Sequence, residues 1–142
     1  MIVCDVNVLV AAFITGHPFH RGARTFLQES LEAGDVAIPD VVWSGLLRTV
    51  TNPHVMHPPA TWPEIAAFVE TIRQHPGYRA NVRGMSAPLE AFVNLCGDAN
   101  AVGNKVSDAY IAAVAIDHKA SIATWDADFG LFPAPVIHPP QT

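Results

Sequence analysis

The fold is decided by residues 107–126, SDAYIAAVAIDHKASIATWD, in which one acid opens a helix and another follows the next strand. Apolar residues at helical spacing predict a helix over Ser107–Lys119. The apolar residues after it predict a strand over Ser121–Trp125. The stretch therefore predicts a helix and a strand with Asp108 near the start of the first and Asp126 at the end of the second.

Asp108 is expected in the first turn of its helix, where the positive end of the helix dipole favours an ionised carboxylate. It shares a helix face with Ile111, Ala112 and Ala115, which should pack on a sheet. The short alanines would let the helix approach the sheet closely. The Asp108 carboxylate is therefore expected to point toward a crevice rather than bulk water.

The N-terminal segment repeats the pattern of a strand followed by an acid. A strand is predicted over Ile2–Cys4, directly before Asp5. An apolar run to Ile14 predicts a helix, with Asn7 as its N-cap. Asp5 and Asp126 are thus both expected at the carboxyl ends of strands.

Helices and strands alternate along the rest of the chain, which predicts one α/β domain over residues 1–142. Its central sheet should be mostly parallel, have four to five strands and be covered by helices on both faces, as three α/β/α layers. In such sheets ligands bind beyond the carboxyl ends of the strands. The remaining predicted elements are helices at Phe19–Gly34, at Asp40–Thr51 with Asp40 as cap, after a Thr61 cap and at Pro88–Cys96, and strands at Val36–Ile38, Tyr78–Val82 and Pro135–Ile137.

The carboxylates Asp5, Asp108 and Asp126 are expected to converge on this crevice. Acids brought together repel one another, so some become protonated or a cation lies among them. Oxygen ligands suit Mg²⁺ or Mn²⁺, which bind phosphates and lower the pKa of bound water. Each acid also has a local interpretation: Asp5 as a helix cap, Asp108 as an ordinary helix-start acid and Asp126 as a turn residue. Their joint placement favours the metal site.

Composition supports a metal-bearing enzyme over a passive nucleic-acid-binding module. The formal net charge is −5 and only eight residues are Lys or Arg, whereas free nucleic-acid binders usually have a basic surface. No apolar run is long enough to span a bilayer, and Asp5 within the opening segment argues against a signal peptide. Cys4 and Cys96 are expected to be free thiols in a reducing cytoplasm.

Three segments carry a family resemblance: IVCDVNVLVAAF, VVWSGLLRTVTNP and GNKVSDAYIAAVAIDHKASIATWDADFGLFP. They resemble PIN-domain ribonucleases, specifically the VapC-type toxins of type II toxin–antitoxin systems. The resemblance implies that Asp5, Asp108 and Asp126 are catalytic metal ligands, with Asp128 as a possible additional ligand. It implies supporting roles for Asn7 and Thr124. It also implies an RNA substrate, a cognate antitoxin protein and a homodimer. Asn104 and Lys105 are weaker candidates for the RNA path, since solvated loop residues are the favoured interpretation.

One position departs from the family pattern. The pattern places a glutamate on the helix after the second strand, and the matching residue here is Gly45. Trp43, Leu46, Leu47 and Val50 are predicted to form the apolar stripe of this helix, with Gly45 off it. A mid-helix glycine costs about 1 kcal/mol relative to alanine, and no turn or cap explains it. The favoured explanation is a detoxifying change, and the alternative is a divergent member with weakened or lost catalysis. Both predict reduced metal affinity and cleavage.

Two other functional classes are kept as alternatives. The first is a non-catalytic PIN-fold module that binds RNA or protein. The second, less favoured, is a haloacid-dehalogenase-like phosphatase with Asp5 as nucleophile, although that family has a second aspartate where this chain has Asn7. The seven histidines match no zinc motif.

Overall fold

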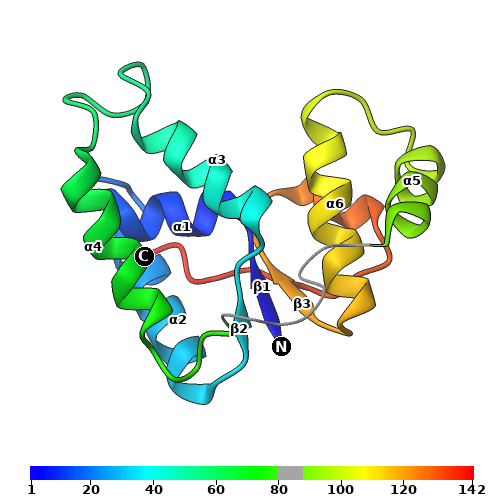
Figure 1. Cartoon of the computed structure of the whole chain (residues 1–142), viewed down its shortest axis with the longest axis horizontal. Coiled ribbons are helices and arrows are strands. Elements are labelled where there is room, and N and C mark those ends of the chain that lie inside the picture. The colour runs from blue at the N-terminus through cyan, green and yellow to red at the C-terminus, as the bar shows by residue number, and fades with distance from the viewer. Residues whose placement is uncertain (80–87) are drawn as a thin grey trace.

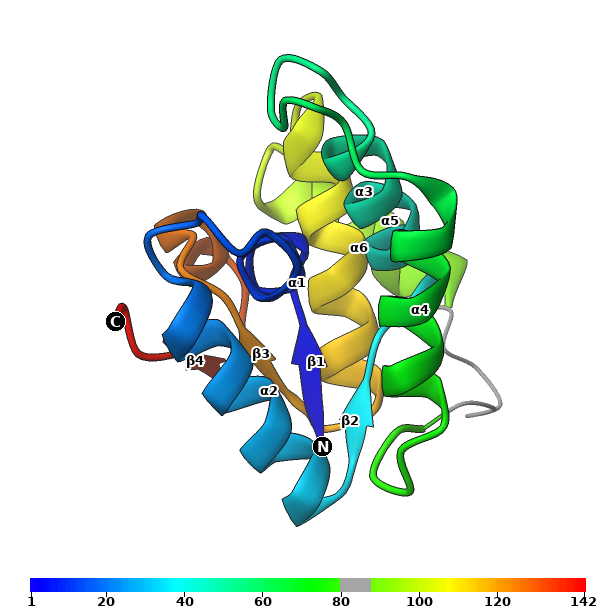
Figure 2. The same ribbon diagram turned by 90° about the vertical axis from the view of Figure 1, so that its left-hand side faces the viewer.

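A parallel sheet of four strands forms the centre of the protein (Figures 1 and 2). The structure, a computed structural model, describes residues 1–79 and 88–142. The strand order is β2-β1-β3-β4, and every pair is parallel, which confirms the predicted α/β architecture. The strands are β1 (Ile2–Cys4), β2 (Val36–Ala37), β3 (Ser121–Ala123) and β4 (Val136–Ile137).

Helices cover both faces of the sheet. The views in Figures 1 and 2 place α2 on one face and α6 on the other, with α5 packed on the outer side of α6. The helices are α1 (Val6–Phe13), α2 (His20–Ala33), α3 (Asp40–Val50), α4 (Trp62–Arg73), α5 (Leu89–Asp98) and α6 (Asn104–Asp117), with a short 3-10 helix η1 (Ala127–Leu131). No helix among the described residues is long and apolar enough to cross a membrane.

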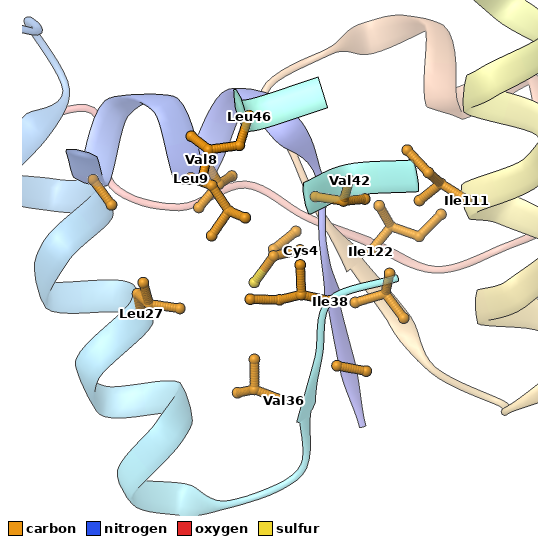
Figure 3. Packing of buried hydrophobic residues seen from close by; sticks show 14 of the residues in the cluster. Cys4, Val8, Leu9, Leu27, Val36, Ile38, Val42, Leu46, Ile111 and Ile122 are labelled. Atoms are coloured by element: carbon orange, nitrogen blue, oxygen red, sulfur yellow. The ribbon is translucent and has the colours of Figure 1, made fainter. Parts of the chain in front are cut away.

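The core lies between the sheet and these helices, because both faces of the central strands are apolar. The side chains of Val3, Cys4 and Ile122 are fully buried. Helices contribute the other large side chains, and Figure 3 shows Leu9 of α1, Leu46 of α3 and others around the strands. Both cysteines are free, and burial raises the pKa of the Cys4 thiol to about 12. Cys4 is therefore a small apolar core residue rather than a nucleophile.

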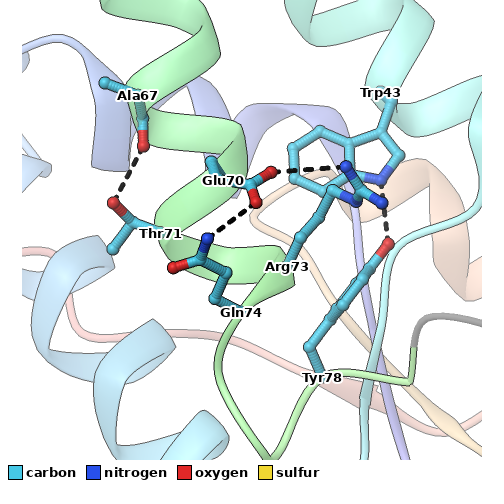
Figure 4. Close-up of polar contacts among 7 residues, drawn as sticks. All are labelled: Trp43, Ala67, Glu70, Thr71, Arg73, Gln74 and Tyr78. Carbon is cyan, nitrogen blue, oxygen red and sulfur yellow. Dashed lines mark hydrogen bonds and ion pairs between the residues drawn. The ribbon is translucent and has the colours of Figure 1, made fainter.

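The α3–α4 region is fixed by polar contacts at its edges. The Trp43 indole donates a hydrogen bond of 3.2 Å to the Tyr78 hydroxyl, which joins α3 to the segment after α4 (Figure 4). Thr61 begins α4 with a capping box: its side chain accepts from the Glu64 backbone, and the Glu64 carboxylate accepts from the Thr61 backbone. The predicted Thr61 cap is confirmed.

Three predicted starts of helices are wrong. Helix α1 begins at Val6 and is capped by Asp5, not Asn7, because the Asp5 carboxylate accepts from the Val6 N–H. Helix α3 has Asp40 as its first residue, preceded by Pro39, and Asp40 makes no capping hydrogen bond. Helix α6 begins at Asn104, so Asp108 lies beyond its first turn; Gly103, with φ of 59°, provides the turn into the helix.

The weak strand predicted over Tyr78–Val82 is described only in part. Tyr78 makes an isolated parallel bridge with Val36, at the β2 edge of the sheet. Residues 80–82 lie outside the described residues.

Candidate active site

A cavity of about 440 Å³ opens beyond the carboxyl ends of β1 and β3, between α3 and α6. Figure 1 shows the end of β1, where α1 begins, lying between these two helices. The cavity lies where ligands bind in parallel α/β sheets. Its lining residues are Asp5, Val6, Asn7, Val10, His17, Val41, Ser44, Gly45, Arg48, Thr49, Asn104, Ser107, Asp108, Ile111 and Asp126. Three acids that are far apart in the sequence therefore line one cavity.

Strand register places Asp5 beside Thr124. Cys4 of β1 pairs with Ala123 of β3, so the next residue of each strand follows at the same level. The Asp5 N–H donates to the Ala123 carbonyl at 3.0 Å. Only 6% of Asp5 is exposed, and both of its carboxylate oxygens are held: Oδ1 accepts from the Val6 N–H and Oδ2 from the Thr124 hydroxyl, each at 2.7 Å.

Thr124 is the centre of this polar network. Its hydroxyl, fully buried, donates to Asp5 and accepts from Asn7 Nδ2 at 3.1 Å and from the Asp126 N–H at 2.9 Å. One donor and two acceptor sites are all that a hydroxyl has, so Thr124 Oγ1 is saturated. Because Nδ2 faces this oxygen, Asn7 presents its Oδ1 elsewhere, and that buried atom has no hydrogen-bond partner among the described residues. Asn7 and Thr124 thus hold Asp5 and Asp126 in place.

Burial and mutual repulsion disfavour ionised acids here. The pKa of Asp5 is raised, first by burial and also by the charge of Asp126, although hydrogen bonds from Thr124 and Val6 oppose the shift. The pKa of Asp108 is raised to about 6 by burial and by the negative charges of Asp5, Asp126 and Asp128. Such a coupled group of acids favours either a bound proton or a bound cation.

The outer part of the site contains Asp126, Asp128 and Lys105. Asp126 lines the cavity and caps η1, since its Oδ1 accepts from the Asp128 N–H at 2.8 Å. Asp128 is not among the lining residues, and its carboxylate lies 3.5 Å from Lys105 Nζ. Asn104 lines the cavity, whereas Lys105 is not among its lining residues. The local roles of Asp5 and Asp126 as caps are real, and both residues also face the cavity.

The donor atoms fit a divalent ion that keeps several of its waters. Within residues 1–79 and 88–142, no three His, Cys, Asp or Glu side chains are close enough together to ligate one ion directly. Mg²⁺ is commonly bound through one or two carboxylates plus water molecules. The acids that repel one another and the unpartnered oxygen of Asn7 suit an ion of this kind with its bound water. The residues present therefore fit the metal that the sequence predicts.

Gly45 faces the cavity from α3, and the prediction that it lies off the buried stripe is wrong. The buried residues of α3 are Val42, Gly45, Leu46 and Val50. A Cβ at residue 45 would lie 2.6 Å from Val6 Cγ2 on α1, closer than carbon atoms normally approach. The glycine thus has a packing reason that sequence alone did not reveal: it lets α3 approach the first turn of α1.

Sequence analysis missed several polar residues of the cavity. Ser44, Arg48 and Thr49 lie on the α3 face that also holds Gly45. Helical spacing from Gly45 would have found Arg48 and Thr49, three and four residues later, and Ser44 lies one turn before Arg48. His17, on the loop between α1 and α2, and Ser107 had no comparable signal in the sequence.

Comparisons with known proteins agree with this architecture. The family model described as PIN domain matches residues 2–133. The chain is 35% identical to Ribonuclease VapC25 and 36% identical to Ribonuclease VapC31, both of Mycobacterium tuberculosis, over 93% of each chain. Its fold is similar to that of a chain in the crystal structure of VapBC2 from Rickettsia felis bound to a DNA fragment from their promoter. The TM-score is 0.68, the sequence identity is 17%, and the match covers 99% of this chain and 100% of the other. It is also similar to a chain in the crystal structure of FitAcB from Neisseria gonorrhoeae, with a TM-score of 0.64, 18% identity and 97% coverage of both. With a family match over most of its length and close VapC relatives, the chain belongs to the PIN domain family, as a VapC-type toxin.

Proposed function

We propose that this VapC-type ribonuclease is a divalent-metal-dependent endoribonuclease, and that Gly45 lowers its activity. The observation that carries the proposal is electrostatic. Asp5, Asp108 and Asp126 line one cavity. Burial and the charge of Asp126 raise the pKa of Asp5, and burial together with the charges of Asp5 and Asp126 raises the pKa of Asp108 to about 6. Sites of this kind are stabilised by a bound cation, and perturbed carboxylates in a cleft are typical of catalytic sites.

Each residue has a distinct task in this proposal. Asp5, Asp108 and Asp126 would hold Mg²⁺ or Mn²⁺ in part through its bound water, since no three acids of the described residues lie close enough to ligate one ion directly. Asp128 would contribute from the rim. Thr124 and Asn7 fix the orientation of Asp5. When bound between these residues, the ion would supply Lewis acidity and a water of lowered pKa for attack on a phosphodiester.

The glutamate expected at residue 45 would add a further carboxylate to the α3 wall, so its absence reduces the negative charge available to hold a cation. A side chain at residue 45 would meet Val6, which occupies the space beside Gly45. Gly45→Glu is therefore best combined with Val6→Ala.

The proposed partners are suggested by the similar structures. The Rickettsia felis and Neisseria gonorrhoeae structures are named as the two-component pairs VapBC2 and FitAcB. We propose by analogy that a cognate antitoxin blocks the cavity of this chain. We also propose that the chain forms a homodimer with two sites and acts in the cytoplasm. The phosphatase alternative loses its basis once the chain belongs to the PIN domain family.

The test is cleavage of single-stranded RNA by the purified protein with Mn²⁺ or Mg²⁺ and with EDTA. We expect slow, metal-dependent cleavage that Asp108→Asn abolishes. Asp117→Asn is the matched control, because Asp117 is an exposed acid on the same helix. Cleavage should rise in the Val6→Ala, Gly45→Glu variant.

Two results would contradict the proposal. Cleavage that continues in the presence of EDTA would contradict the proposed metal dependence. A folded Val6→Ala, Gly45→Glu variant that binds RNA without metal and never cleaves it would favour the non-catalytic binding module.

A further inference from the structure

Arg48 is the basic side chain that α3 presents to the carboxylate cavity, and among the cavity's described lining residues it is the one Lys or Arg. Three other basic residues of the described chain are engaged elsewhere: Lys105 with Asp128, Arg73 with Glu70 and Arg79 with Asp35. The Arg48 guanidinium makes no ion pair or hydrogen bond with any residue that the structure describes. An unpaired cation therefore lines a cavity rich in acids.

The unpaired state of Arg48 is informative because acids line the same cavity. If Arg48 served to neutralise the acids, it would lie within ion-pair distance of Asp5, Asp108 or Asp126, and it does not. Its charge is also absent from the causes that lower the pKa of Asp5 or Asp108, whereas Lys105 is among them for Asp108. Arg48 is thus separated from the acids by the space of the cavity.

The α3 wall around Arg48 is polar. Ser44 precedes Arg48 by one helical turn and lines the cavity, and its side chain has no hydrogen-bond partner among the described residues. The Thr49 hydroxyl is engaged, because it donates to the Gly45 carbonyl at 2.7 Å. Gly45 adds no side chain to this wall. Arg48 and Ser44 are therefore the groups of α3 with donors left for a ligand.

The chemistry of these groups selects an anion. A guanidinium binds phosphate through two parallel hydrogen bonds, and a serine hydroxyl donates a further one. We propose that Arg48 binds a backbone phosphate of the RNA in this cavity, from the wall formed by α3. The inference rests on the proposed function and adds a phosphate-positioning residue to it. It also shifts the RNA path away from Lys105, whose charge is shared with Asp128.

The test compares three variants of the full chain: Arg48→Ala, Arg48→Lys and the control Arg24→Ala. Arg24 is exposed on α2 and lines a different cavity, between α2 and α4, so its removal changes the net charge equally without touching the site. Binding of a short fluorescent single-stranded RNA is measured by anisotropy over a series of salt concentrations, with EDTA and with Mn²⁺. Mn²⁺ binding without RNA is measured by calorimetry, and cleavage is followed separately.

Arg48→Ala is expected to weaken RNA binding about tenfold, as for the loss of a charge-assisted hydrogen-bonded contact. The slope of log affinity against log salt should fall in magnitude by about 0.7, the value for one phosphate contact on a single strand. Arg48→Lys should keep that slope and lose part of the affinity, because lysine retains the charge but cannot make the two parallel hydrogen bonds of a guanidinium. Mn²⁺ binding should not weaken.

The outcomes separate this inference from the proposed function. Equal effects of Arg48→Ala and Arg24→Ala on affinity and slope overturn the inference, even if the protein cleaves RNA with Mn²⁺. RNA binding that depends on Arg48, without any cleavage, supports the inference and contradicts the proposed activity. Absence of RNA binding by the unaltered protein overturns both.

Discussion

Replacing Gly45 with alanine adds one methyl group, and the structure predicts that this group harms the fold unless Val6 is shortened. The new Cβ would lie 2.6 Å from Val6 Cγ2 and 3.4 Å from Val6 Cγ1. Val6 is stiff, because its branched Cβ leaves one strongly preferred rotamer in a helix. Gly45 is buried and sits mid-helix in α3. The methyl group therefore pushes α3 away from α1 or forces Val6 from its rotamer.

Two opposing effects set the size of the change. Alanine improves the helix propensity at residue 45 by about 1 kcal/mol. Overpacking of a tight contact costs about 1–3 kcal/mol. The free energy of unfolding should therefore fall by up to about 2 kcal/mol in Gly45→Ala. In a Val6→Ala background the clash is gone, so the same substitution should raise it by about 1 kcal/mol.

The assay is urea denaturation of the four proteins in this cycle: unaltered, Gly45→Ala, Val6→Ala and the double variant. The predicted coupling free energy between residues 45 and 6 is about 1–3 kcal/mol, within the range for residues in direct contact. If Gly45→Ala has the same stabilising effect in both backgrounds, to within about 0.5 kcal/mol, the steric argument is refuted. The glycine would then have no packing reason, as sequence analysis first held.

Three further predictions concern the carboxylate cavity. Asp5→Asn should weaken Mn²⁺ binding at least about tenfold by calorimetry, and unaltered binding would remove Asp5 from the ligands. The pKa of Asp108 lies above its ordinary value of 3.8, at about 6, so the folded state holds this proton more tightly than the unfolded state. Without metal, the free energy of unfolding should therefore fall as pH rises from about 4 to 6. Asp108→Asn should flatten that decline, measured as denaturation midpoints. An equal decline in the variant would argue against the raised pKa of Asp108. Thr124→Val should destabilise the fold by about 1–3 kcal/mol because buried partners lose their hydrogen bonds, whereas Thr124→Ser should lose much less in the same denaturation assay.

The strand-end acids could be predicted from the sequence because their positions depend on local patterns. A short apolar strand followed by an acid occurs at β1 and again near β3, and the rule for parallel sheets brings such residues to one edge. The pairing of Asp5 with Thr124 follows only from the strand register, which needs the tertiary structure.

The α3 wall of the site could not be predicted in the same way. Apolar periodicity placed the buried stripe of α3 on Trp43, Leu46, Leu47 and Val50. Leu46 and Val50 are buried, whereas Trp43 and Leu47 are only partly buried. The actual stripe includes Gly45, because the close approach of α1 determines which side of α3 is covered. The positions of Arg48 and His17 at the cavity depend on that same placement of helix and loop, for which a single sequence carries little signal.

The one-to-one alignment of β1 with β3 restricts where the chain can change in length. A residue inserted within β3 would replace Thr124 as the neighbour of Asp5 and turn the hydroxyl to the other face of the sheet. Residues 52–59 between α3 and α4 are mostly exposed and make no strand pairs, so insertions there would leave the acids aligned. Single-residue insertions along the chain should therefore distinguish the segments whose register aligns the site residues from the loops that only connect them.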